Sequence, residues 1–236
     1  MTASGPAAGT GGSQTPPLGA TTLSKAVAGK TVLVVGDSWA ANLGVGMSSV
    51  ASSTATIVNA GIGGCGIMLP DPSTTNATCS AWPTSWPAYL AEYKPNAVVL
   101  TVGFFDVTPQ KLPGEAAAHD LSDPAHLAVF QNHLDKAIAI LTADKAPLYL
   151  MNSALVAKPA YRASALAMNQ TLAAAVRTHP GVHLLDVQAQ LCNGTGCPRV
   201  IDGINVYDPT QHPAPAARDR LADWALDTIF PAQPAS

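Results

Sequence analysis

Five short apolar runs alternate along the chain with segments of helical character, and this alternation is the strongest constraint on its fold. The runs cover residues 31–36, 56–60, 97–103, 147–152 and 182–186. The spacing of apolar residues predicts helices over residues 40–50, 85–93, 124–143, 159–178 and 214–230. Strands that are apolar throughout are covered on both faces. The pattern therefore predicts an α/β fold with three layers, α/β/α, around a flavodoxin-like five-stranded parallel sheet.

The regular pattern occupies one part of the chain. Residues 1–29 are rich in Gly, Ala, Pro, Thr and Ser without a period, which predicts a flexible linker. Residues 30–232 form one predicted domain, and residues 233–236 form a tail. Two long segments, 65–86 and 104–123, interrupt the rhythm after the second and third strands. Long loops at this edge of a sheet are commonly functional.

The charge content excludes some classes of function. Only 11% of the 236 residues are charged, against a typical ~25%, and the formal net charge is −3 without any run of Lys or Arg. A nucleic-acid binder carries a basic patch, so we expect no nucleic-acid partner. No stretch of about eighteen apolar residues predicts a membrane span, and residue 1 is not followed by the charged and apolar regions of a signal peptide.

The four cysteines form two close pairs in the sequence. Cys65 and Cys79 bracket one Pro-rich loop, and Cys192 and Cys197 bracket C-N-G-T-G-C. Short loops closed by two cysteines indicate disulfides and hence an oxidising compartment. Free thiols are the alternative. A zinc site is disfavoured because neither pair has C-x-x-C spacing, and we expect no metal.

The first run continues into T-V-L-V-V-G-D-S-W at residues 31–39. A buried strand that stops at Gly36 places the next side chains at the carboxyl edge of the sheet, where open α/β folds keep their sites. Ser38 is therefore a candidate nucleophile, and the alternative is a Ser that caps the next helix. Asp37 is predicted to be structural and to tie the turn.

A nucleophilic serine needs a base, and the sequence offers one near its end. Asp208 and His212 share one loop before the last predicted helix, so the acid can orient the imidazole ring. We predict His212 as the base and Asp208 as its partner, with Asp202 as the alternative acid. His126 and His133, seven apart on one predicted helix, are expected on a solvated face.

A glycine-rich run, G-I-G-G-C-G, follows the second strand. It matches the G-x-G-x-x-G pattern of dinucleotide sites, but Pro70 and Pro72 prevent a helix from starting there. The alternative interpretation is a backbone opened by glycine, so that an amide N–H can face an oxyanion. Cofactors are therefore not expected.

Together these blocks resemble the SGNH (GDSL-like) hydrolase superfamily over essentially residues 30–230. Gly36-Asp37-Ser38 corresponds to the first block, and in the second, residues 59–64, Gly64 stands at the position of the family's oxyanion glycine. The chain looks most similar to the extracytoplasmic SGNH domains attached to bacterial membrane O-acyltransferases. Its G-C-G loop, the Cys79-Ser80-Ala81-Trp82 segment, the late cysteine pair and the N-terminal linker suggest this subfamily.

Two blocks depart from the family pattern. Phe105 stands where an oxyanion Asn is expected in the third block, and phenylalanine cannot donate a hydrogen bond. Losing one donor from a working oxyanion hole costs about 10²–10³ in rate. The fourth block has a spacing of four from its acid to His212 instead of three. Some acyltransferase-linked members similarly carry an aromatic residue at the third block.

The resemblance implies a serine esterase or O-acyltransferase for O-acetyl or short acyl groups on cell-surface glycans. Ser38, His212 and Asp208 would be catalytic, the amides of Ser38 and Gly64 would form the oxyanion hole, and Trp39, Phe105 and Trp82 would line the substrate pocket. The partner would be an acylated or acyl-accepting small molecule or glycan, with a membrane acyltransferase domain upstream of the linker. The location would be extracytoplasmic.

Two alternatives come from other classes. Phe105 and the longer fourth block favour a catalytically weak or inactive module that binds a glycan or protein partner. A cytoplasmic lipase or thioesterase is disfavoured by the cysteine pairs.

Overall fold

The computed structural model describes residues 25–69, 77–193 and 196–232. Most of the predicted linker (1–24) and the predicted tail (233–236) lie outside the described residues. The last residues assigned to the linker belong to the folded part: η1 (Lys25–Val27) is one 3-10 turn, and Val27 is fully buried.

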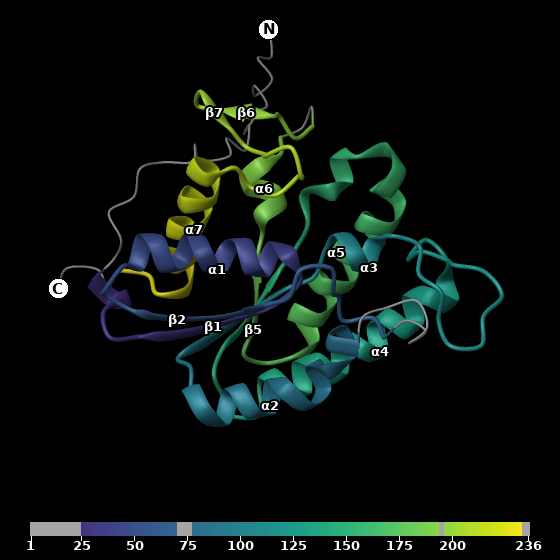
Figure 1. The fold of residues 1–236 in the computed structure, drawn as a ribbon, viewed down its shortest axis with the longest axis horizontal. Helices are drawn as coiled ribbons and strands as arrows, with labels where there is room; N and C mark the ends of the chain where they lie inside the picture. Colours follow the sequence, from purple (N-terminus) through teal and green to yellow (C-terminus); the bar gives the residue numbers. More distant parts are fainter. Residues whose placement is uncertain (1–24, 70–76, 194–195, 233–236) are drawn as a thin grey trace, which may run out of the picture.

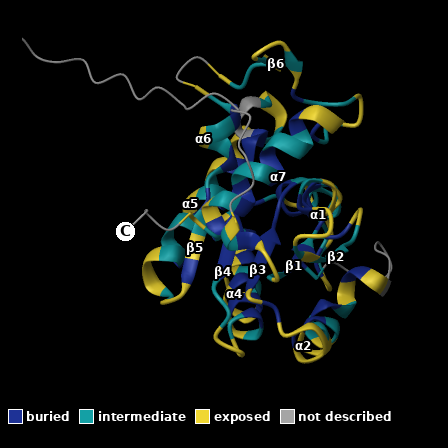
Figure 2. Ribbon diagram, turned by 90° about the vertical axis from the view of Figure 1, so that its left-hand side faces the viewer, coloured by how far each residue is buried: buried dark blue, intermediate teal, exposed yellow. Residues whose placement is uncertain are grey.

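A five-stranded parallel sheet forms the centre of the molecule (Figures 1 and 2). Its strands are β1 (Thr31–Gly36), β2 (Thr56–Gly61), β3 (Ala97–Thr101), β4 (Leu148–Met151) and β5 (Val182–Leu185). Their order is β2-β1-β3-β4-β5, and each neighbouring pair is parallel. The predicted fold class is therefore confirmed, including the flavodoxin-like strand order.

Helices cover both faces of this sheet. They are α1 (Ser38–Ala51), α2 (Trp82–Tyr93), α3 (Phe104–Val107), α4 (Pro124–Leu141), α5 (Arg162–Thr178), α6 (Val187–Leu191) and α7 (Pro215–Ile229). Three further 3-10 turns are η2 (Ala77–Ala81), η3 (Ala154–Ala157) and η4 (Pro159–Tyr161), and a small antiparallel hairpin is formed by β6 (Val200–Ile201) and β7 (Ile204–Asn205). The hairpin and the short helices α3 and α6 lie in segments without predicted elements.

The alternation of side chains along β1 divides the core into two halves. Leu33 and Val35 pack against α2, α4 and α5 on one face. Val32 and Val34 pack against α1 and α7 on the other. All four side chains are fully buried, which is why this strand is apolar at consecutive positions. In Figure 2 the buried residues gather along the strands between the two helix layers.

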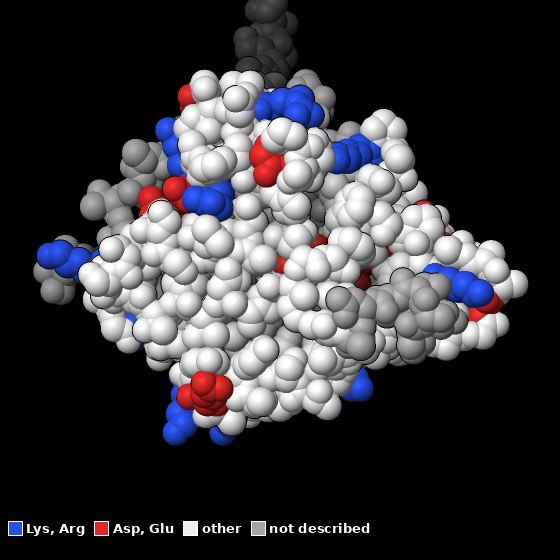
Figure 3. Space-filling view, viewed as in Figure 1, with Lys and Arg blue, Asp and Glu red and all other residues white. Residues whose placement is uncertain are grey.

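Because all five strands are parallel, their carboxyl ends lie at one edge of the sheet. The segments that follow β1, β2, β3 and β4 start there, so Ser38, the glycine-rich run and both long loops belong to this edge. No helix in the described part of the chain has the length and apolar character needed to cross a bilayer. The face drawn in Figure 3 carries few charged side chains, as expected from the low charge content.

Gly36 is where β1 meets β3 most closely. Its φ is +125°, and a Cβ at this position would lie 2.0 Å from the carbonyl oxygen of Thr101. We expect Gly36→Ala to lower the free energy of unfolding by at least about 2 kcal/mol more than Gly114→Ala does. Gly114 also has a positive φ (+86°), but a Cβ added there would have no atom within 4 Å, so this control carries backbone strain without a clash. Urea unfolding of both variants measures the difference, and equal losses would contradict the expectation.

Candidate active site

Ser38 is the first residue of α1, and a buried carboxylate holds it in place. Asp37 is fully buried and caps the helix: its Oδ1 accepts hydrogen bonds from the amides of Trp39 (2.9 Å) and Ala40 (3.4 Å). The same oxygen accepts a hydrogen bond from the hydroxyl of Thr101 on β3 (3.0 Å). Asp37 therefore joins the ends of two neighbouring strands to the start of α1, as expected for a structural role.

His212 reaches Ser38 from the far end of the chain. Its Nε2 lies 2.7 Å from Ser38 Oγ, although 174 residues separate them. The loop that carries His212 follows the β6–β7 hairpin, and its turn is closed by a hydrogen bond from the amide of Asp208 to the carbonyl of His212 (2.8 Å). Pro213 is buried and bridges to Tyr207, which fixes the loop before α7 begins.

The predicted acid does not contact the ring of His212. Instead, the hydroxyl of Thr210 lies between them, with its Oγ1 2.7 Å from His212 Nδ1 and 2.7 Å from Asp208 Oδ1. An ionised carboxylate can only accept, so the hydroxyl donates its single proton to Asp208 and accepts from Nδ1–H of His212. This tautomer leaves Nε2 free to accept the proton of Ser38.

Asp208 is itself well held. Besides the hydroxyl of Thr210, its Oδ1 accepts the amides of Thr210 (2.8 Å) and His212 (3.1 Å). Burial acts to raise its pKa, but these hydrogen bonds outweigh that effect and the pKa lies below its ordinary value. The alternative acid, Asp202, is exposed and its carboxylate is 3.9 Å from Arg220, so it is not part of this chain of contacts.

The glycine-rich run after β2 lies beside Ser38. A Cβ at Gly63 would be 3.9 Å from Ser38 Cβ, and Gly64 has a φ of +81°, which favours glycine. The amide of Ser38 is the first of α1, and the Asp37 side chain accepts from the next two amides instead. An amide at the first helical position has no partner within the helix, so it can serve an oxyanion.

Phe105 lies beside Gly64. Its ring lies 3.6 Å from where a Cβ of Gly64 would be, so it faces the proposed oxyanion position without offering a donor. The ring packs edge-on against Phe104. Gln110 donates a hydrogen bond to the carbonyl of Phe105, which ties α3 to the loop that follows it.

A second buried carboxylate anchors the glycine-rich run. Asp106 Oδ1 accepts the amides of Ile67 (2.9 Å) and Met68 (3.0 Å), and its other oxygen has no hydrogen-bond partner. Burial, reinforced by the negative charge of Asp37, raises the pKa of Asp106 to about 7. Burial also raises the pKa of Asp37 against the lowering effect of its hydrogen bonds. Both anchors of the site are thus carboxyls for which ionisation is costly.

The predicted pocket residues separate in the structure. Trp39 lines a cavity of about 200 Å³ beside the Ser38–His212 pair, whereas Trp82 is buried in the core against Trp86. The indole of Trp82 donates to the carbonyl of Ile67 (3.2 Å). Trp82 therefore supports the loop that carries Gly64 from behind and does not line the cavity.

Both expected disulfides are present, Cys65–Cys79 and Cys192–Cys197. The first follows Gly64 directly and joins the glycine-rich run to η2. The second closes the loop after α6, and the Sγ of Cys197 contacts the carbonyl of Ala154 on η3 (3.7 Å). Each bridge thus fixes a loop at the carboxyl edge of the sheet.

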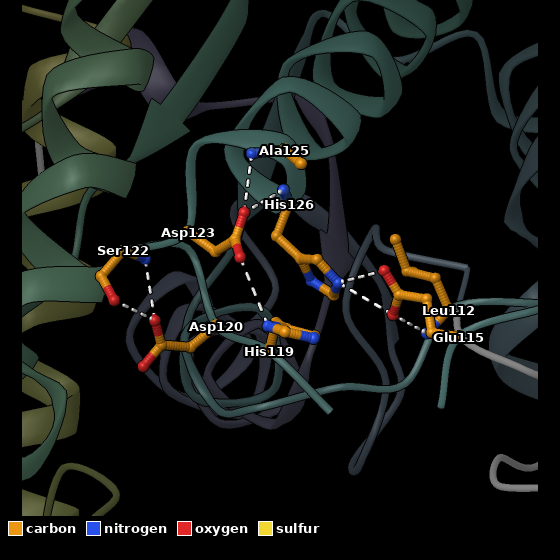
Figure 4. Close-up of polar contacts among 8 residues, drawn as sticks. All are labelled: Leu112, Glu115, His119, Asp120, Ser122, Asp123, Ala125 and His126. Atoms are coloured by element: carbon orange, nitrogen blue, oxygen red, sulfur yellow. Dashed lines mark hydrogen bonds and ion pairs between the residues drawn. The ribbon is translucent and has the colours of Figure 1, made fainter. Parts of the chain in front are cut away.

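The second long loop, between α3 and α4, is held by a separate polar cluster (Figure 4). Contrary to the expectation of a solvated face, His126 is buried, and its Nε2 contacts both oxygens of Glu115 (2.8 and 2.9 Å). His119 pairs with Asp123 (3.3 Å), which caps α4. His133 is also partly buried, with its ring edge-on to Trp82. The helix itself is present as the periodicity predicts, but the loop folds over the helix face that carries His126.

Within residues 25–69, 77–193 and 196–232, no group of three or more His, Cys, Asp or Glu side chains is arranged to hold a metal ion. What the described site offers is a serine against an imidazole, an acid linked to that ring through a hydroxyl, and the glycine-rich run beside the serine. This arrangement can perform nucleophilic attack on an acyl carbon and stabilise the resulting oxyanion.

Comparison with known proteins agrees with this fold. The model of one protein family, DUF459, described as a protein of unknown function, matches residues 31–197. The match includes Ser38 and Gly64 and ends before the loop of His212. No curated protein sequence matches the chain.

Several solved structures share the architecture. A putative lipolytic protein of the G-D-S-L family from Desulfitobacterium hafniense is 13% identical with a TM-score of 0.58, covering 85% of this chain and 99% of that one. The lipopolysaccharide acetyltransferase periplasmic domain of Salmonella ser. Paratyphi A is 14% identical with a TM-score of 0.54, covering 86% and 84%. A family two carbohydrate esterase from Clostridium thermocellum, in complex with cellohexaose, is 13% identical with a TM-score of 0.52, covering 85% and 63%. At these identities the likeness shows a shared fold, which is the fold that the resemblance to the SGNH hydrolases implied.

Thr210 offers a direct test of the contacts behind His212. Thr210→Val removes the hydroxyl while keeping the shape, so the ring loses its link to Asp208. We expect labelling of Ser38 by a fluorophosphonate to slow by about ten- to hundredfold, less than the ~10⁴ seen when a directly bonded triad acid is neutralised. Thr210→Ser keeps the hydroxyl and is the matched control. Equal labelling rates for the valine and serine variants would contradict the role of the hydroxyl.

The raised pKa of Asp106 predicts how the stability of the protein depends on pH. Its folded pKa of about 7 lies above the ordinary 3.8, so the folded state holds the proton more tightly. The stability that this provides is complete below about pH 4 and is lost as the pH rises towards 7. Asp106→Asn should therefore show a smaller fall in Tm between pH 5 and pH 8 than the wild type does. The exposed Asp144→Asn is the control, and identical pH profiles for Asp106→Asn and wild type would contradict the expectation.

Proposed function

This chain belongs to DUF459, a family of proteins of unknown function, and we propose from its geometry that it is a serine-dependent ester hydrolase or O-acyltransferase. The observation that carries the proposal is the 2.7 Å contact between Ser38 Oγ and His212 Nε2. A nucleophile and a base at hydrogen-bond distance, with the base oriented from behind, are the signature of an activated serine.

In the first half of the reaction, Ser38 Oγ attacks the acyl carbon of an ester while His212 Nε2 takes the hydroxyl proton. The carbonyl oxygen becomes an oxyanion, and the amides of Ser38 and Gly64 donate to it. When the tetrahedral intermediate collapses, His212 returns the proton to the leaving alcohol. The acyl group then remains bound to Ser38 Oγ.

The second half reverses these roles. A water or a sugar hydroxyl gives its proton to His212 and attacks the acyl carbon, and Ser38 leaves with the proton that His212 returns. Water gives hydrolysis, and a sugar hydroxyl gives acyl transfer. Throughout, the Thr210 hydroxyl and the Asp208 carboxylate hold Nδ1–H and stabilise the imidazolium that forms at each step.

We propose O-acetyl or other short acyl groups on cell-surface glycans as substrates. The cavity of about 200 Å³ that Trp39 and Gln211 line is smaller than the roughly 300–1,000 Å³ of pockets for drug-sized ligands, so a sugar residue that fills it leaves no room there for a long acyl chain. Solved structures of this fold that are named as a lipopolysaccharide acetyltransferase domain and a carbohydrate esterase motivate the choice of glycans.

The two disulfides support an extracytoplasmic location for this activity. Disulfides persist in oxidising compartments and are rare where thiol reductants are maintained. Both bridges fix loops beside the site, so the proposed active form is the oxidised one.

Intact-mass spectrometry after incubation with a fluorophosphonate tests the proposal. We expect a single adduct on wild type and none on Ser38→Ala, with labelling of His212→Ala slower by at least about 10³-fold. Ser49→Ala, an exposed serine on the same helix, is the matched control and should label like wild type. Folded wild type without an adduct would contradict an activated serine and favour a binding module, for which Phe105 is the structural reason.

A further inference from the structure

The cavity beside Ser38 contains two positive charges that the proposed acyl chemistry does not use. Trp39 and Tyr207 form aromatic parts of its wall, with ring centroids 6.4 Å apart. Lys158 and Arg199 line the same cavity. Trp39 follows Ser38 in the chain and Gln211, also in the wall, precedes His212, so the cavity is lined by the chain neighbours of both residues.

The two cations come from different segments of the chain that contact each other. Lys158 directly follows η3, which comes after the carboxyl end of β4, and Arg199 precedes the β6–β7 hairpin. The Cys192–Cys197 disulfide lies between these walls, since Cys197 lines the cavity and contacts the carbonyl of Ala154 on η3. The backbone at both residues is therefore held by the fold, while the side chain of Arg199 is exposed and that of Lys158 is partly buried.

In the part of the chain that the structure describes, no acidic side chain pairs with either cation. Among the described residues, neither Lys158 nor Arg199 takes part in an ion pair, and no Asp or Glu lines the cavity. Burial, and then the nearby charge of Arg199, lower the pKa of Lys158. In a chain with a net charge of −3, two adjacent uncompensated cations in one cavity have an electrostatic cost that a bound anion would relieve.

We propose that this cavity binds an anionic sugar residue, bearing a carboxylate or a phosphate, of the glycan that donates or accepts the acyl group. Lys158 and Arg199 contact the anionic group, and Trp39 and Tyr207 contact the apolar face of the ring. This inference rests on the proposed function and adds its substrate class. Guanidinium and ammonium groups give charge-assisted hydrogen bonds to such anions, about twice as strong as neutral ones.

Binding can be measured separately from turnover in the full chain carrying Ser38→Ala. Ligand-observed NMR titrations would use methyl glucuronide, glucose 6-phosphate and, as the neutral reference, methyl glucoside. We expect at least one anionic sugar to bind about tenfold more tightly than the neutral one at low salt, and the preference to shrink as salt screens the charges. A preference for glucuronide or for the phosphate identifies which anion the cavity takes.

Variants of the two cations test whether the cavity is responsible. Lys158→Met and Arg199→Gln, each in the Ser38→Ala background, should reduce the anionic preference by about three- to tenfold. Lys25→Met and Arg177→Gln are matched controls, because both residues are exposed and lie next to the amino ends of β1 and β5, at the opposite edge of the sheet. Equal affinity for anionic and neutral sugars, no binding of any sugar, or equal effects of test and control variants would overturn the inference.

Turnover assays distinguish a failure of this inference from a failure of the proposed function. Wild type is assayed on acetylated methyl glucuronide and acetylated methyl glucoside, and Lys158→Met and Arg199→Gln should lower the ratio of the two kcat/KM values. An anionic preference in binding without turnover of either ester would support the anion-binding cavity and count against the proposed function. Turnover of both esters, with a ratio of kcat/KM values that the variants leave unchanged, would support the proposed function and overturn the anion-binding cavity.

Discussion

The buried carboxylate of Asp37 is the interaction on which the geometry of the site depends. Three hydrogen bonds to its Oδ1, from the amides of Trp39 and Ala40 and from the hydroxyl of Thr101, join β1, β3 and α1 at one point. The Asp37 side chain accepts from the amides of Trp39 and Ala40 and not from that of Ser38, which is the amide that we propose for the oxyanion. Burial of a carboxyl is costly, and these hydrogen bonds offset part of that cost. Gly36, which has no Cβ, lets β1 lie close to Thr101.

Much of the fold could be predicted because its signals are local and repeated. Consecutive buried positions such as Val32 to Val35 indicate a central parallel strand, and five such runs give the size of the sheet. The burial of His126 could not be predicted in this way. It depends on Glu115, eleven residues earlier, which folds back over α4 as part of a loop without periodicity. The β6–β7 hairpin has two residues in each strand, too few for an alternating pattern to show.

The sequence predicted which residues lie together at this edge of the sheet better than it predicted the contacts between them. Ser38, Gly64 and His212 could be placed because strand ends and the loop before the last helix converge at one edge. The position of the Thr210 hydroxyl between Asp208 and His212 has no sequence signal of its own. From the sequence, Asp208 and His212 are only four residues apart where the family pattern has three. The extra residue allows a hydroxyl to bridge the gap that the longer loop creates. Lys158 and Arg199 carried no sequence signal either, because only the fold brings η3 against the loop of the second disulfide.

Phe105 changes how the proposed oxyanion hole would work. An Asn at this position would add a third donor, whereas the ring of Phe105 lies against Gly64 and offers none. An apolar ring lowers the local dielectric constant, which would strengthen the hydrogen bonds from the two proposed amide donors. The compensation is partial, because a preorganised donor is worth about 2.7–4 kcal/mol in such sites. The proposed enzyme would therefore stabilise its oxyanion less well than a site with Asn at this position, and its second step would depend more on how closely the acceptor is held beside Ser38.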